Sequence, residues 1–150
     1  DVMRNYIEKN KENIDIQITY AQLLAIAEMR NEARKVLKPF RSRDAVSHLL
    51  ADLYQQDMMW DSAAAVLRAL NEADTSNVIP IMKLGTLYEE RGWYATSLKY
   101  FENLAILTPD DTLVKQRIEQ IKRKIAYLQR LKFEEDKIPV IELEPIKNQN

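Results

Sequence analysis

Residues 79–88 read Ile79-Pro80-Ile81-Met82-Lys83-Leu84-Gly85-Thr86-Leu87-Tyr88, and residues 45–54 read Ala45-Val46-Ser47-His48-Leu49-Leu50-Ala51-Asp52-Leu53-Tyr54. The two segments lie 34 residues apart, and leucine, a small residue, leucine and tyrosine recur at the same four positions. The register continues further on, where Trp60 falls on Tyr94, Ala63 on Ser97 and Leu67 on Phe101. A period of about 34 residues is typical of a repeated helix–turn–helix unit.

Composition excludes most other folds. The chain has 150 residues, a net charge of −1, no cysteine, one histidine and only two glycines. Phosphate-binding loops, hairpin turns and Rossmann crossovers all need more glycine than this. The length is sufficient for one domain with its own core. We therefore expect a nearly all-helical chain.

The clearest copy of this pattern begins with Ile81-x-x-Leu84-Gly85-x-x-Tyr88. It continues with Gly92, Tyr94, Ser97-x-x-x-Phe101 and Pro109. This segment resembles the tetratricopeptide repeat, in which Trp-x-x-Leu-Gly-x-x-Tyr is followed by Ala-x-x-x-Phe and then Pro. Ile81 stands where that family has tryptophan, and Ser97 where it has alanine. The resemblance implies an all-α solenoid of stacked helix pairs.

The repeated residues have packing reasons. Gly85 and Ala51 are small enough for the second helix of each unit to approach the first, and Ala63 and Ser97 leave room from the other side. Tyr54, Tyr88, Leu67 and Phe101 are expected to fill the space between the helices. A left-handed residue at Gly92 would end the first helix, and Pro109 cannot continue the second.

The repeat predicts the organisation of the chain. Residues 1–13 match the second helix of a truncated unit, and we expect further repeats or another domain before them. Three units follow at 14–43, 44–77 and 78–111, the first of them degenerate and four residues shorter. A long capping helix is expected at 112–134. The tail, 135–150, contains Pro139 and Pro145, which favour extended or disordered backbone.

Catalytic chemistry finds little support in the sequence. His48 is the single histidine, so a site built on two histidines is excluded. A serine nucleophile that needs a histidine base would have to lie beside His48 itself. We find no phosphate-binding loop, no zinc motif and no calcium loop. We therefore predict no enzyme activity, no cofactor, no metal and no small-molecule substrate. No apolar run approaches a membrane span, and nothing indicates a compartment.

The resemblance implies a protein–protein interaction scaffold or adaptor that holds a peptide or helix in the concave groove lined by the first helices. At the groove positions of the family, this chain carries Gln22, His48, Asp52, Gln55, Ile79, Met82, Thr86 and Glu89. Ile79 and Met82 are apolar although the core pattern does not need them. Leu49 and Ile79 replace the asparagine and lysine that a carboxylate clamp requires, and only Lys83 fits one.

Two alternatives concern the capping helix. It carries seven basic residues and, before Glu134, the single acid Glu119, so its face could touch nucleic acid, although the chain as a whole is close to neutral. Apolar residues at 114, 118, 121, 125 and 128 could also form a seam for self-association into a homo-oligomer. A segment around Val140 to Leu143 could occupy a groove in the same or a neighbouring chain.

Overall fold

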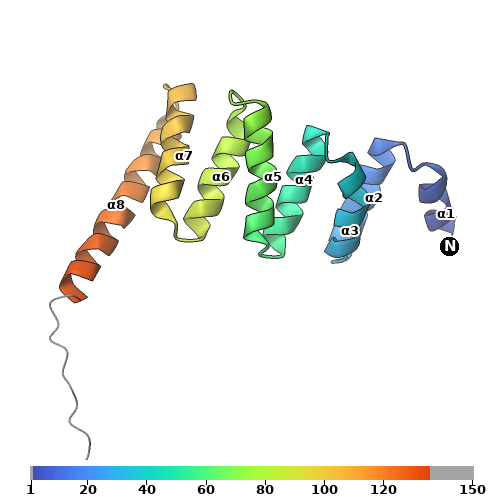
Figure 1. Cartoon of the computed structure of the whole chain (residues 1–150), viewed down its shortest axis with the longest axis horizontal. Coiled ribbons are helices and arrows are strands. Elements are labelled where there is room, and N and C mark those ends of the chain that lie inside the picture. The colour runs from blue at the N-terminus through green and yellow to red at the C-terminus, as the bar shows by residue number, and fades with distance from the viewer. Residues whose placement is uncertain (1, 136–150) are drawn as a thin grey trace, which may run out of the picture.

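The computed structural model describes residues 2–135, and every regular element in that range is helical. Helices follow one another along the long axis of the molecule (Figure 1). Their bounds are α1 (Val2–Lys9), α2 (Ile14–Ile26), α3 (Arg30–Leu37), α4 (Asp44–Gln56), α5 (Trp60–Ala73), α6 (Val78–Glu90), α7 (Tyr94–Leu107) and α8 (Thr112–Glu135), with a 3₁₀ turn, η1 (Lys38–Phe40), after α3. The all-α prediction is confirmed. The predicted tail from residue 136 onward lies outside the described residues.

The same turn joins the two helices of each pair. Glu28, Met58 and Gly92 follow the first helix of successive pairs, and all three have positive φ angles, of 62°, 56° and 75°. The next residue donates its N–H to a carbonyl five positions earlier at 2.8 Å in each case: Met29 to Leu24, Met59 to Tyr54, and Trp93 to Tyr88. A left-handed residue at this position closes the helix by satisfying its last carbonyls. The repeat is therefore visible in the backbone itself.

The core runs from pair to pair without a break. Buried residues of α4, α5 and α6 form one cluster, and those of α6, α7 and α8 form the next. Gly85 is buried where a Cβ would lie 2.8 Å from Phe101 Cε2, so no larger residue fits without a shift. Ser97 Oγ donates to the Gly85 carbonyl at 2.7 Å, which ties α7 to α6. Each pair thus buries its apolar face against its neighbour.

Aromatic rings pack at the boundary between the second and third pairs. The Tyr88 ring stacks on Trp93, with centroids 5.7 Å apart, and on Tyr100, with centroids 5.6 Å apart. The Arg91 guanidinium lies over the Trp93 ring. Trp93 is half exposed but packed on one side, so it is an edge residue of this cluster.

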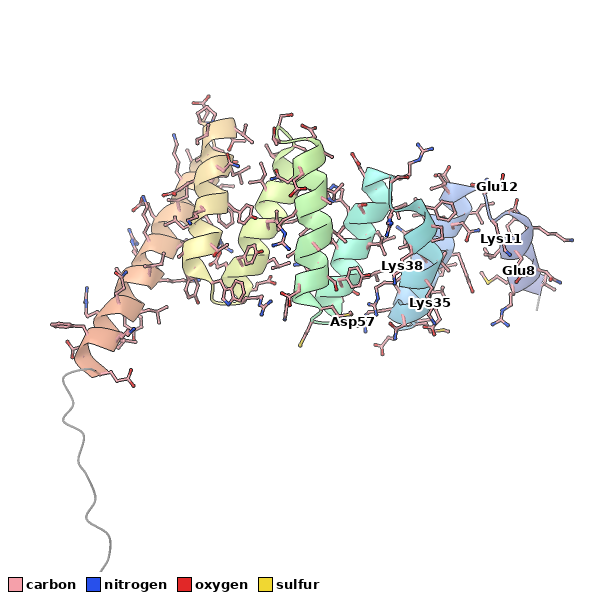
Figure 2. All side chains as sticks on the ribbon, viewed as in Figure 1. Glu8, Lys11, Glu12, Lys35, Lys38 and Asp57 are labelled. Carbon is pink, nitrogen blue, oxygen red and sulfur yellow. The ribbon has the colours of Figure 1, made fainter. Side chains whose placement is uncertain are left out.

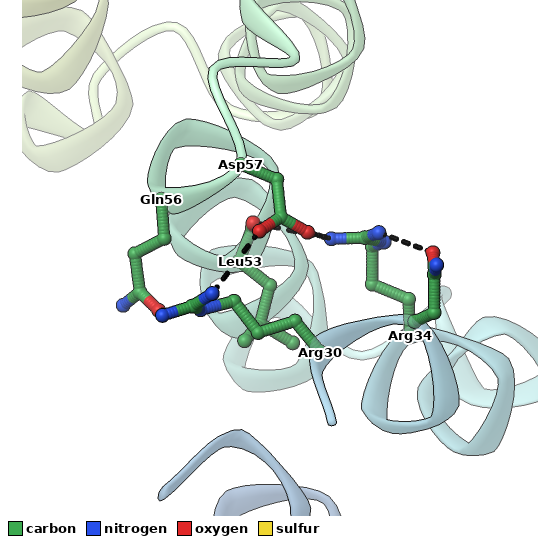
Figure 3. A network of polar contacts seen from close by, with 6 residues as sticks. Arg30, Arg34, Leu53, Gln56 and Asp57 are labelled. Atoms are coloured by element: carbon green, nitrogen blue, oxygen red, sulfur yellow. Dashed lines mark hydrogen bonds and ion pairs between the residues drawn. The ribbon is translucent and has the colours of Figure 1, made fainter. Parts of the chain in front are cut away.

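The first pair packs on the second through an apolar cluster of α2, α3 and α4, and an ion-pair network adds to this contact. Its second helix, α3, has 8 residues, whereas α5 and α7 have 14 each. Arg34, which is 6% exposed, forms an ion pair with Asp57 and donates to the Leu53 carbonyl at 3.3 Å. Arg30 lies 3.4 Å from the other Asp57 oxygen (Figure 3). The hydrogen bond from Arg34 is the main reason that the pKa of Asp57 is lowered.

The two ends of the described chain are single helices. Buried Gln17 of α2 donates to the carbonyls of Ile7 at 3.3 Å and Asn10 at 3.0 Å, and so fastens α1 to the array. At the other end α8 buries Val114, Ile118 and Ile121 against α7, while its second half exposes Leu128 and Leu131. α8 ends at Glu135, one residue beyond the predicted capping helix.

Candidate functional site

The first helices of the pairs present one continuous face, which we call the first-helix face. Two sets of ion pairs define it. Lys83 Nζ of α6 lies 2.6 Å from Asp52 Oδ1 of α4. On the other side of α6, Glu89 contacts Arg117 and Lys124 of α8. Side chains on the same side of these three helices therefore share a surface.

The predicted groove residues differ in how much of them is accessible. Gln22, Ile79 and Met82 are exposed; His48, Asp52, Gln55 and Thr86 are half-buried; Glu89 is buried. On α6, Ile79, Met82, Lys83 and Thr86 lie at helical spacings of three and four, so they share the side of Lys83. The structure thus places the two apolar residues beside the Asp52–Lys83 ion pair.

Glu89 requires a correction. The sequence analysis expected an exposed groove residue, but its side chain is 8% exposed. Arg117 Nε lies 2.9 Å from Oε2, and Lys124 Nζ donates to Oε1 at 2.7 Å. A buried carboxylate needs such partners to offset its lost hydration. Glu89 therefore pairs α6 with the capping helix: Oε1 accepts a hydrogen bond from Lys124, whereas buried Oε2 accepts none and is matched only by the charge of Arg117.

His48 is half-buried on α4, and its Nδ1 atom is buried without a hydrogen-bond partner. Burial is the main cause of its lowered pKa, and the nearby Lys83 charge lowers the pKa further. Asp52 and Asp44 act in the opposite direction. The net effect lowers the pKa of His48 and so disfavours the protonated imidazole.

The sequence analysis missed what α8 contributes. Leu113 follows Ile79 by 34 residues, and it is 73% exposed. Extending the repeat period into the capping helix would have placed it in the same row as Ile79 and Ala45. Lys83, the one residue that fits a carboxylate clamp, pairs with Asp52 in the structure. That pairing could have been anticipated from the opposite charges at neighbouring groove positions.

Neither a metal centre nor a membrane span is found among residues 2–135. No group of three or more His, Asp or Glu side chains in that range could hold a metal ion. None of the described helices is long and apolar enough to cross a membrane.

Comparison with solved structures identifies the architecture, with 57 matching chains. A crystal structure of MamA superimposes with a TM-score of 0.68 at 15% identity, covering 83% of this chain and 75% of that one. The Sgt2 TPR domain from Aspergillus fumigatus gives 0.63 at 14% identity, covering 89% and 90% of the two chains. The fold is that of the tetratricopeptide repeat. The predicted family resemblance and fold class are thereby confirmed at the level of structure.

A third neighbour is the first tetratricopeptide domain of Spaghetti (RPAP3), described as bound to an HSP90 peptide. It gives a TM-score of 0.61 at 12% identity, covering 78% of this chain and 96% of that one. No family model matches the sequence, and no curated protein matches it either. The likeness to tetratricopeptide domains therefore rests on three-dimensional structure and on the residues of the repeat.

Proposed function

We propose that this chain is a protein–protein interaction scaffold that holds a peptide or helix of another protein on the first-helix face. One observation carries the proposal: Ile79 and Met82 leave 45% and 47% of their surface exposed, side by side, next to an ion pair. Apolar side chains grouped on a polar surface mark contact sites more often than chance. Leu113 extends the same apolar row onto α8.

The chemistry of the face suggests an amphipathic occupant. Ile79 and Leu113 lie in the first turns of α6 and α8, and the polar residues Gln22, Asp52 and Thr86 lie about two turns further along α2, α4 and α6. An occupant with one apolar side and one polar side would match both rows. Methionine is flexible and polarisable, which suits an adaptable apolar contact.

The neighbour described as bound to an HSP90 peptide supports a peptide as the kind of occupant. A terminal carboxylate is not the expected anchor here, because Leu49 and Ile79 lack the donors of a carboxylate clamp and Lys83 already pairs with Asp52. We do not propose nucleic-acid binding as a second function. Two of the basic residues of α8, Arg117 and Lys124, already pair with Glu89, whose single negative charge offsets part of theirs.

A photo-crosslinking residue at position 82 tests the proposal, with the same residue at position 106 as the matched control. Ile106 is 77% exposed on α7, one of the second helices, so it lies away from the first-helix face. We expect one partner to crosslink at 82 and not at 106. Equal crosslinking at both positions would refute the assignment of the face.

Affinity for the crosslinked partner then separates contact from folding. Met82→Glu removes an apolar contact of about 1.5–3 kcal/mol and adds a charge, so binding should weaken by tenfold or more. Ile106→Glu should leave affinity unchanged. Both variants alter exposed side chains, and their melting temperatures should match that of the unmodified chain.

A further inference from the structure

The short α3 leaves a notch on the opposite side of the array from the first-helix face. We call it the α3–α5 notch, a cavity of about 350 Å³. It is bounded by the segment after α3, by α4 and by the second half of α5. Its lining residues are Lys38, Arg41, Ser42, Asp44, Ser47, Leu50, Tyr54, Val66, Ala69, Leu70 and Ala73.

A comparison of the space between α3 and α5 with the equivalent space between α5 and α7 explains the notch. The corresponding space between α5 and α7 is filled by Tyr100, which stacks on Tyr88. The residue 34 positions before Tyr100 is Val66, which is too small to fill that space. In addition, α3 ends at Leu37, where Pro39 follows within a turn, so no helix lies opposite Ala69 and Ala73. Small side chains and a short helix together create the cavity.

The notch has an apolar floor and a basic edge. Val66, Leu70 and Tyr54 form part of the floor, whereas Lys38 and Arg41 lie at the edge. Residues 35–43 carry four positive charges and no negative one, and Asp44 is the one acid among the described lining residues. Figure 2 shows Lys35 and Lys38 on this part of the array. Ser47 Oγ donates to the Arg41 carbonyl at 2.7 Å and fixes the edge in place.

We propose that the α3–α5 notch binds residues 138–145 of a second copy of this chain. That segment reads Ile138-Pro139-Val140-Ile141-Glu142-Leu143-Glu144-Pro145. In this stretch the apolar residues Ile141 and Leu143 alternate with Glu142 and Glu144. The apolar residues match the chemistry of Val66 and Leu70 in the notch, and the glutamates are opposite in charge to Lys38 and Arg41. Charge complementarity therefore selects this occupant.

The segment must come from another copy because of its reach. An extended chain covers at most about 3.5 Å per residue, so the six residues from Glu135 to Ile141 span about 20 Å. Figure 1 shows α7, α6 and α5 in succession between α8 and the notch. The last turns of α8 also project away from the other helices in Figure 1, so the tail begins at the end of the molecule away from the notch. A contact of this kind joins two different surfaces and extends the assembly beyond a dimer unless the rotation closes it.

Sedimentation of the full chain over a range of concentrations tests the proposal. Lys38→Glu with Arg41→Glu reverses the charge of the notch edge, and Glu142→Lys with Glu144→Lys reverses the charge of the tail segment. We expect the unmodified chain to gain mass with concentration and each reversed chain to associate about tenfold more weakly or worse. The chain that carries all four substitutions should associate again, because the pairs are then restored with opposite signs.

Controls separate this contact from a general effect of charge. Lys9→Glu with Lys11→Glu makes the same change in charge near α1 and should leave association unchanged. Circular dichroism verifies that each variant stays helical, since all the substituted positions are exposed or lie beyond residue 135. The proposal is overturned if the unmodified chain stays monomeric at all concentrations, if the notch reversal leaves association intact, or if the four-substitution chain fails to recover.

Discussion

Gly85→Ala should destabilise the third pair, although alanine is the better helix former. In mid-helix the substitution contributes about 1 kcal/mol of stability through propensity alone. Here the new Cβ would lie 2.8 Å from Phe101 Cε2 and 3.0 Å from Cδ2. Phe101 is 5% exposed, so its ring has nowhere to move without disturbing α7. Overpacking of this kind costs about 1–3 kcal/mol, and we expect a net loss of about 1 kcal/mol.

Thermal melting followed by circular dichroism measures the effect. For a chain of this length, a net loss of about 1 kcal/mol lowers the melting temperature by about 2–4 °C. The second pair supplies the control, because it carries Ala51 and Leu67 at the corresponding positions, both fully buried. Gly85→Ala with Phe101→Leu should therefore recover most of the loss. A higher melting temperature for Gly85→Ala alone would refute the steric reasoning, and Gly85→Leu should be more damaging still.

Three further predictions follow from single contacts. Met58→Gly should stabilise the chain by about 0.5–1 kcal/mol in urea unfolding, because Met58 has a φ of 56° and is 74% exposed. Gly92→Ala should lower the free energy of unfolding by a similar amount, because Gly92 has a φ of 75°. Asp57→Asn should lower the melting temperature at pH 7, because it removes the charge that pairs with Arg34. The folded pKa of Asp57 lies below its unfolded value, so the difference in melting temperature should disappear as the pH falls below about 4. A difference that persists in acid would exclude the charge as its cause. Glu89→Gln should lower the free energy of unfolding by about 1–2 kcal/mol and speed hydrogen exchange in α8 but not in α4. If α8 exchanges at the same rate in the variant and the unmodified chain, Glu89 does not hold the capping helix.

The repeat pattern was sufficient to predict the fold, because it depends on local signals. Leucine, a small residue and tyrosine recur at fixed spacing, and each has a packing role that does not depend on distant parts of the chain. The left-handed turns were only partly accessible in this way. Gly92 indicates one directly, but Glu28 and Met58 adopt the same conformation without glycine. Tertiary packing there outweighs a local preference of about 1–2 kcal/mol.

The candidate site was less predictable because it depends on which charges meet across helices. Glu89 occupies a groove position of the repeat, yet Arg117 and Lys124 of α8 contact it and its side chain is buried. The period alone gives the direction of a side chain but not its partner. The α3–α5 notch was also absent from the sequence analysis, since it arises from the small size of Val66 and the early end of α3 together.

The three left-handed turns also determine how this array could be lengthened. Met58 and Gly92 are 34 residues apart and end in the same backbone geometry, so a copy of residues 59–92 inserted after Gly92 would meet matching backbone at both joints. Each insertion would add one first helix to the face and move α1 and α8 one pair further apart. The distance between α1 and α8 would thus increase in equal steps, one for each helix pair that is inserted.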